Sequence, residues 1–141
     1  MTKQEREEKH RKKLQSLLAF DKEYYIGDKI PVGMDEVGRG PIAGPVVSAC
    51  VCMKEDSEII GIDDSKKVTK AGRIKLLDKI IEDARAIGIG IVPHNIIDRI
   101  NILNATKLAM RAALYDMLSV KRVVGSSGII LSYESLVHAL S

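Results

Sequence analysis

Two acidic residues, Asp35 and Glu36, end an apolar segment that begins at Val32 and has the composition of a β-strand. A buried carboxylate is costly unless it is paired, hydrogen-bonded or bound to a cation, and two adjacent carboxylates repel each other. A divalent cation such as Mg²⁺ prefers carboxylate oxygens and relieves that repulsion. Neighbouring side chains on a regular strand point to opposite faces, so both can bind one cation only if the strand ends or twists there. The alternative is a strand end at which one carboxylate points into solvent.

A glycine-flanked arginine, Gly38-Arg39-Gly40, follows the acid pair. Glycine lets the backbone approach a ligand closely, so that its amide and carbonyl groups can reach a sugar hydroxyl. A guanidinium matches the geometry of phosphate oxygens. Alone, such a turn is usually just a hairpin, but beside two carboxylates it favours a site for a metal ion and a phosphodiester. A nucleotide P-loop is excluded because the Gly-Lys-Ser/Thr ending is missing.

A second polar cluster, Asp64-Ser65-Lys66-Lys67, lies in a loop between apolar segments. Its hydroxyl and two ammonium groups could bind phosphates of a nucleic-acid backbone. Taken alone, it is equally typical of a turn that begins at Asp64 or Ser65, with both lysines in solvent.

The elements that must position these residues follow an α/β pattern. Apolar spacing predicts helices, with Thr69 capping the second, over residues 3–25, 70–85 and, as one helix or a pair, 94–119. Strands are predicted over residues 32–37, 46–53 and 86–92, with a possible further strand over 59–62. Strands followed by alternation with helices predict a mixed sheet flanked by helices.

Length and composition agree with one globular domain. The chain has 141 residues, of which 45% are hydrophobic and 29% charged, so wholesale disorder is excluded. Lys and Arg number 22 against 19 Asp and Glu, and the resulting charge of +3 permits contact with a polyanion without demanding it. Residues 1–27 are predicted to be a charged helical extension, either a solvated appendage or an arm that grips nucleic acid.

No secretory signal and no membrane-spanning stretch are expected, because the charged start lacks an apolar segment behind it. Cys50 and Cys52 are two residues apart on a predicted strand and therefore point to the same face, where the backbone geometry rarely suits a disulfide. We expect both to be small buried apolar residues in a reducing compartment, the cytoplasm by default.

Three segments together resemble the bacterial ribonuclease HII family. Val32–Val47 is similar to the family's signature, and Asp64–Thr69 and Arg99–Met110 are similar to its next two blocks, in family order. The resemblance covers about Lys22–Val120. It implies a ribonuclease H-like domain over residues 28–141 and an Mg²⁺- or Mn²⁺-dependent endonuclease. Such enzymes cut the RNA strand of RNA–DNA hybrids and cut at ribonucleotides embedded in duplex DNA. Nothing in the sequence demands more than a monomer.

The resemblance also implies roles for individual residues. Asp35 and Glu36 would be the metal-binding catalytic carboxylates. The ribose 2′-hydroxyl would be sensed by Gly38, Arg39 and Gly40, and the substrate backbone would lie near Ser65, Lys66 and Lys67. The implied mechanism is two-metal hydrolysis that leaves a 3′-hydroxyl and a 5′-phosphate.

The chain departs from the family pattern after about residue 120. The family places further carboxylates beyond the helix that ends near Leu118, whereas residues 121–131 contain no Asp or Glu. We therefore expect an incomplete C-terminal part, caused by truncation or a change of reading frame, and weak or absent cleavage by this form. The alternative function is a relative that holds hybrid duplexes through Arg39 and the lysines without cutting them.

Overall fold

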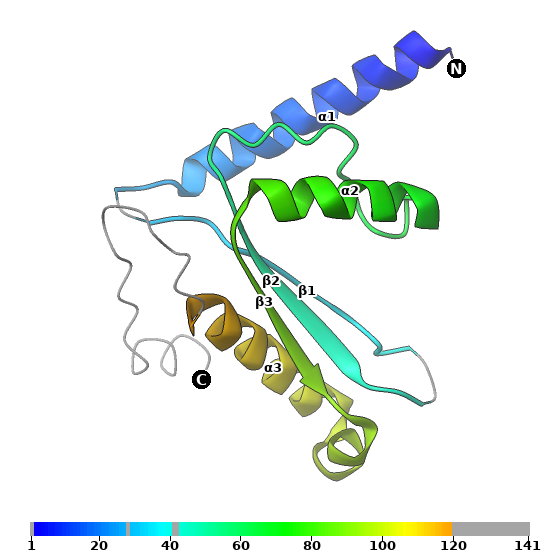
Figure 1. Cartoon of the computed structure of the whole chain (residues 1–141), viewed down its shortest axis with the longest axis vertical. Coiled ribbons are helices and arrows are strands. Elements are labelled where there is room, and N and C mark those ends of the chain that lie inside the picture. The colour runs from blue at the N-terminus through cyan, green and yellow to red at the C-terminus, as the bar shows by residue number, and fades with distance from the viewer. Residues whose placement is uncertain (1, 28, 41–42, 120–141) are drawn as a thin grey trace. The chain divides into compact units, whose positions relative to one another are not determined.

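The computed structural model describes residues 2–27, 29–40 and 43–119 (Figure 1). The elements follow the order α1 (Lys3–Tyr24), β1 (Gly33–Val37), β2 (Val46–Met53), α2 (Lys70–Asp83), β3 (Ala84–Val92) and α3 (His94–Ser119). The α/β architecture expected from the sequence is confirmed. The chain divides into two compact units: unit 1 joins Met1–Pro31 to Met53–Ala84, and unit 2 joins Val32–Cys52 to Arg85–Ser141. The domain boundary expected between residues 27 and 28 stays a prediction.

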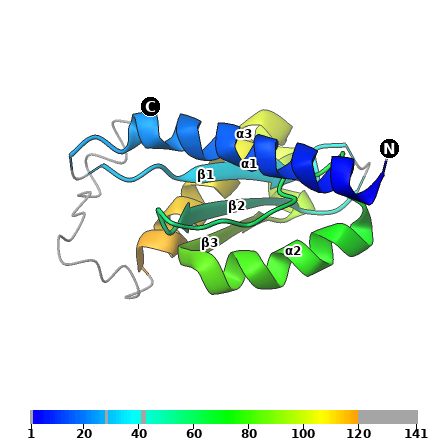
Figure 2. The same cartoon turned by 90° about the horizontal axis from the view of Figure 1, so that it is seen from above.

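Unit 2 is built on a sheet with the strand order β1-β2-β3, followed by α3 (Figure 2). β1 and β2 are antiparallel, in a register that places Asp35 opposite Ala49 and Glu36 opposite Ser48. Residues of β2 are alternately buried and half-buried, because successive side chains point to opposite faces of the sheet. The buried set faces α3, as the 3.6 Å contact between Cys50 Sγ and Met117 Sδ shows. Both cysteines are buried and free, as predicted.

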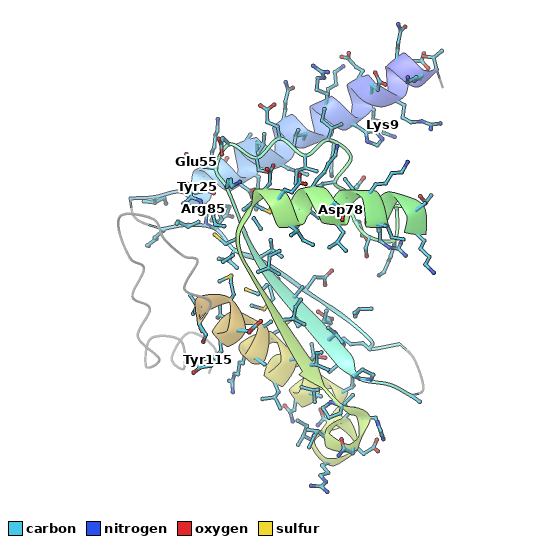
Figure 3. The ribbon with its side chains drawn as sticks, viewed as in Figure 1. Lys9, Tyr25, Glu55, Asp78, Arg85 and Tyr115 are labelled. Carbon is cyan, nitrogen blue, oxygen red and sulfur yellow. The ribbon has the colours of Figure 1, made fainter. Side chains whose placement is uncertain are left out.

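Small residues let α3 pack directly against the backbone of β3. A Cβ atom at Gly90 would lie 1.9 Å from the carbonyl oxygen of Ala109, and one at Gly88 would lie 2.0 Å from that of Ala113. Both alanines are fully buried. The core beside this contact consists of Val46, Val92, Ala105 and Ala109, against which Ile96, Ile97, Ile100 and Ile102 pack. Figure 3 shows the side chains that lie between α3 and the strands.

The sequence predicted one helix or a helix pair over residues 94–119. The backbone of α3 is non-helical at Asn101, so the pair is confirmed. Asn101 adopts φ 65° and ψ 165°, and its side-chain oxygen accepts a hydrogen bond of 3.0 Å from the backbone N–H of Asn104. This hydrogen bond is of the kind that an N-cap makes, although the positive φ is unusual for one, and Asn101 therefore starts the second helical segment. Further along, Asp116 Oδ2 accepts a 2.9 Å hydrogen bond from the N–H of Ile89 and so ties α3 to β3.

Unit 1 contains α1, α2 and the segment that joins β2 to α2. Neither helix contains a buried residue. α2 begins as predicted, because the Thr69 side chain accepts a hydrogen bond from Gly72 N at 3.1 Å. It ends at Asp83, two residues earlier than predicted, since Ala84 is extended (φ −71°, ψ 139°) and begins β3.

The possible strand at residues 59–62 is wrong. This segment is a turn with irregular flanks, in which Gly61 adopts φ +98°, a conformation that interrupts an extended strand. Ile59 is nevertheless buried, so its apolar character reflects burial and not a strand. Within the part of the chain that the structure describes, no helix has the length and apolarity needed to cross a bilayer.

Candidate active site

The acid pair lies in β1, with its two carboxylates on opposite faces of the sheet. Glu36 stands opposite the fully buried Ser48 and shares the α3 side of the sheet, and its side chain is only 18% exposed. Asp35 is opposite Ala49 on the other face and is exposed. Because β1 stays regular through both residues, the alternation expected of a strand separates the two side chains.

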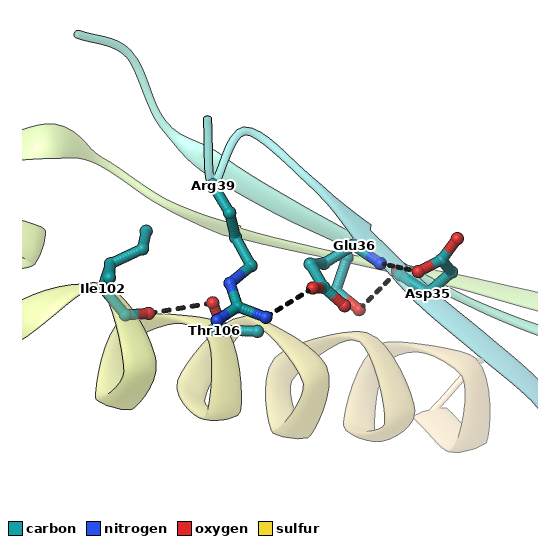
Figure 4. Close-up of polar contacts among 6 residues, drawn as sticks. Asp35, Glu36, Arg39, Ile102 and Thr106 are labelled. Atoms are coloured by element: carbon teal, nitrogen blue, oxygen red, sulfur yellow. Dashed lines mark hydrogen bonds and ion pairs between the residues drawn. The ribbon is translucent and has the colours of Figure 1, made fainter. Parts of the chain in front are cut away.

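The turn after β1 requires glycine at its first position. Gly38 adopts φ +103°, and a Cβ there would lie 2.3 Å from the carbonyl oxygen of Pro45. The chain therefore folds back closely, and Arg39 Nη1 comes to 3.1 Å from Glu36 Oε1 (Figure 4). The Arg39 side chain remains 50% exposed, so its guanidinium is accessible while it is paired with the carboxylate.

Two hydrogen bonds hold the backbone at the acid pair. Asp35 Oδ1 accepts one of 2.9 Å from the N–H of Glu36, and the hydroxyl of Ser48 donates another of 2.9 Å to the carbonyl oxygen of Asp35 (Figure 4). The contribution of Ser48 was not predicted from the sequence. The available signal was its polar side chain at a position of β2 whose neighbours on the same face are apolar.

The described residues do not form a complete metal centre. Asp35 and Glu36 offer carboxylate oxygens, the donors that Mg²⁺ and Mn²⁺ prefer, but they point to opposite faces. Among the residues that the structure describes, no three His, Cys, Asp or Glu side chains converge on one point. A cation held by either carboxylate would need further oxygen ligands, for example from water or a substrate, and the metal-binding role of the pair stays a prediction.

The second cluster lies in unit 1 and forms an ordered turn. Asp64 accepts two hydrogen bonds, one at Oδ1 from Lys66 N (2.9 Å) and one at its carbonyl oxygen from Lys67 N (2.8 Å). Arg73 of α2 closes the turn, because its Nη1 donates to the carbonyl oxygens of Ser65 and Val68 at 2.9 and 2.8 Å. The turn predicted here is confirmed, whereas the contribution of Arg73 was not foreseen.

The neighbouring carboxylate of Asp63 links this turn to α1. A 2.8 Å hydrogen bond from the backbone N–H of Asp64 lowers the pKa of Asp63, and the charges of Lys67 and Lys13 act in the same direction. Lys13 Nζ of α1 lies 4.0 Å from Asp63 Oδ1. Unit 1 therefore places cationic side chains from the turn and from α1 around one acidic residue.

Comparison with known proteins identifies the family to which the chain is similar. A family model described as ribonuclease HII matches residues 32–127, which include all eight candidate site residues and extend beyond residue 120, where the sequence resemblance ended. A ribonuclease HII of Listeria monocytogenes serotype 4a (strain HCC23) is 48% identical over 111 residues, which are 78% of this chain and 42% of that protein. One from Listeria innocua serovar 6a is 54% identical over 85 residues, or 60% of this chain and 33% of that protein.

The chain thus spans less than half the length of these curated relatives. The match nevertheless covers β1, its glycine turn, the Ser65–Lys67 turn and all of α3. Because the family model covers well over half of the chain and contains both residue clusters, the chain belongs to the ribonuclease HII family.

Proposed function

We propose that this protein is an endoribonuclease that hydrolyses the RNA strand of RNA–DNA hybrids and cuts at ribonucleotides embedded in duplex DNA. Family membership supports the proposal. The observation that carries it is the turn at Gly38, which brings Arg39 to 3.1 Å from Glu36 at the end of β1. A cation suited to phosphate and a carboxylate suited to metal thereby lie within hydrogen-bond reach of each other.

The chemistry we propose is metal-dependent hydrolysis that leaves a 5′-phosphate and a 3′-hydroxyl, with Mn²⁺ or Mg²⁺ as cofactor. Asp35 and Glu36 contribute carboxylate ligands, and water and substrate phosphate oxygens complete the coordination. When bound, such cations activate water and stabilise the leaving oxygen.

The glycine turn is suited to recognising the substrate. Among the described residues, a Cβ at Gly40 would meet no atom within 4 Å, so they leave the backbone there open to close approach by a ribose. The half-exposed guanidinium of Arg39 can exchange the Glu36 carboxylate for a phosphate, since both are bound through the same N–H donors. In unit 1, we propose that Ser65, Lys66 and Lys67 bind the nucleic-acid backbone.

The cellular setting is part of the same proposal. Both cysteines are free thiols, which agrees with a reducing compartment, and we propose that the protein acts in the cytoplasm as a monomer.

A second candidate function is binding of hybrid duplexes without cleavage. It is favoured by one observation: among the described residues no three metal-ligating side chains converge. Arg39 and the two lysines would then hold the backbone, and binding would survive removal of divalent ions.

Cleavage and binding assays separate the two functions. An RNA–DNA hybrid and a DNA duplex with one ribonucleotide are incubated with the protein in Mn²⁺, in Mg²⁺ and in EDTA. Metal-dependent cleavage that is lost in Asp35→Asn and Glu36→Gln, but kept in the matched control Asp78→Asn on α2, supports the nuclease. Binding that persists in EDTA without cleavage under any condition supports the second function. Absence of both would refute the two proposals.

A further inference from the structure

Arg73 is the residue that holds the shape of the turn carrying Lys66 and Lys67. Its Nη1 atom donates to the carbonyl oxygens of Ser65 and Val68, at 2.9 and 2.8 Å, and so joins the two ends of this turn. Two side-chain hydrogen bonds to backbone carbonyls eight and five residues away restrict the path of the chain between them. The lysines lie inside the restricted segment.

The position of Arg73 is fixed by the capped start of α2. Arg73 is the fourth residue of α2, and its backbone N–H donates to the carbonyl oxygen of Thr69 at 2.8 Å. Thr69 caps the helix by accepting a hydrogen bond from Gly72 N at 3.1 Å. The guanidinium therefore projects from the first turn of a capped helix back onto the preceding loop, where the two N–H groups of Nη1 meet two carbonyl acceptors.

The ammonium groups of the two lysines, by contrast, are exposed, although the charge of Lys67 also acts on the neighbouring carboxylate of Asp63. Lys66 and Lys67 are exposed, and neither ammonium group forms a hydrogen bond or ion pair among the residues described. Only their backbone N–H groups are bonded, both to Asp64. The backbone under the lysines is thus ordered while their charges remain available to an external anion.

We propose that Arg73 is a positioning residue for nucleic-acid binding, which orders the Ser65–Val68 turn so that Lys66 and Lys67 meet phosphates without a further loss of backbone entropy. This inference rests on the proposed role of these lysines in binding the substrate backbone. Ordering one backbone residue changes a binding constant by about tenfold. Loss of the Arg73 bonds shifts that cost from folding to binding, because the turn must then be ordered by the ligand.

Salt dependence distinguishes positioning from direct contact. Each lysine that neutralises a phosphate adds about 0.9 to the slope of log K against log salt, or roughly eightfold in affinity at about 0.1 M salt. A positioning residue changes affinity by the same factor at every salt concentration, since the number of phosphates neutralised is unchanged. Arg73→Gln should therefore weaken binding about tenfold with an unaltered slope.

The test measures binding of a fluorescent RNA–DNA hybrid to the full chain in EDTA, over a range of salt concentrations. Compared are the wild type, Arg73→Gln, Arg73→Lys, the double variant Lys66→Gln/Lys67→Gln and the triple variant that combines it with Arg73→Gln. Lys79→Gln is the matched control, because it removes one positive charge from an exposed position of the same helix. Thermal melts followed by circular dichroism check that every variant is folded.

We expect the double lysine variant to bind less tightly and to have a smaller slope of log K against log salt. In that background, Arg73→Gln should change the affinity less than twofold. Arg73→Lys should bind with intermediate affinity, because its ammonium keeps the charge and can donate to carbonyls, but the side chain is one bond shorter than the path to Arg Nη1. Normal affinity of Arg73→Gln for the hybrid would overturn the inference. So would a salt slope that Arg73→Gln lowers as much as a lysine substitution does, or a full tenfold effect of Arg73→Gln in the background of the double lysine variant. If the double lysine variant binds like the wild type, the lysine contacts of the proposed function fail, and the inference fails with them.

Discussion

Three glycines near the acid pair allow the cost of the close turn after β1 to be separated into its physical parts. Gly38 combines a φ of +103° with a backbone atom 2.3 Å from a hypothetical Cβ, whereas Gly44 has a φ of +120° but nothing within 4 Å. Gly40 has neither feature. Gly44→Ala therefore tests backbone strain alone, Gly38→Ala tests strain together with close approach, and Gly40→Ala tests neither.

The expected losses of unfolding free energy follow from these differences. A positive φ in a residue with a Cβ costs about 1–3 kcal/mol, so Gly44→Ala should lose about 2 kcal/mol. Gly38→Ala adds a clash with the carbonyl of Pro45, which is backbone and cannot rotate away, and overpacking adds about 1–3 kcal/mol. We expect a total near 4 kcal/mol for Gly38→Ala, and a change within about 0.5 kcal/mol for Gly40→Ala.

Urea denaturation followed by circular dichroism gives the three free energies, and thermal melts give a second estimate. At about 4 °C per kcal/mol for a chain of this length, the midpoint of Gly38→Ala should fall by roughly 15 °C. Because the same turn brings Arg39 to Glu36, this variant should also bind hybrid duplexes less tightly than Gly44→Ala. Equal losses in Gly38→Ala and Gly44→Ala would refute the close-approach argument, and a large loss in Gly40→Ala would refute the account of the whole turn.

Other variants test the packing, the titration and the capping that the structure shows. Gly90→Ala should lose at least about 3 kcal/mol in urea denaturation, because its Cβ would lie 1.9 Å from the Ala109 carbonyl oxygen, whereas Gly33→Ala, with its nearest atom at 3.9 Å, should be nearly neutral. Burial raises the pKa of the Cys50 thiol from 9.0 to about 11, so the folded state retains the proton more strongly. The unfolding free energy should thus be constant below about pH 9 and fall by about 3 kcal/mol between pH 9 and 11, and Cys50→Ala should remove that part of the fall. Thr69→Ala should lower stability by about 1 kcal/mol and shorten α2 at its start, as amide hydrogen exchange would show; unchanged protection there would contradict the capping role.

Short-range features of the fold were predictable because they depend on residues close together in the sequence. Composition predicted the strand Val46–Met53 with the bounds that the structure has. Capping chemistry likewise predicted that α2 begins after Thr69. The helix pair that meets at Asn101 was likewise among the alternatives. The error at residues 59–62 has the same origin: three isoleucines around a glycine are compatible with a strand, and only the φ of Gly61 excludes it.

The candidate site was predictable in its residue types but not in its geometry. Adjacent carboxylates before a glycine-flanked arginine were sufficient to suggest a metal and phosphodiester site. Period-two alternation also indicated that Asp35 and Glu36 diverge unless the strand is distorted, and β1 is regular. The 3.1 Å pairing of Arg39 with Glu36 depends on how tightly the turn closes, which local pattern does not specify.

The sequence alone determined the family, the order of the elements apart from the extra strand at residues 59–62, and the identity of the groups available for chemistry, because these follow from residue types and spacings along the chain. The tertiary structure decided which face each carboxylate occupies, that Ser48 bonds the carbonyl of Asp35, and that Gly88 and Gly90 admit the backbone of α3. Such contacts join residues distant along the chain, so they depend on the path of the whole backbone and not on any local preference.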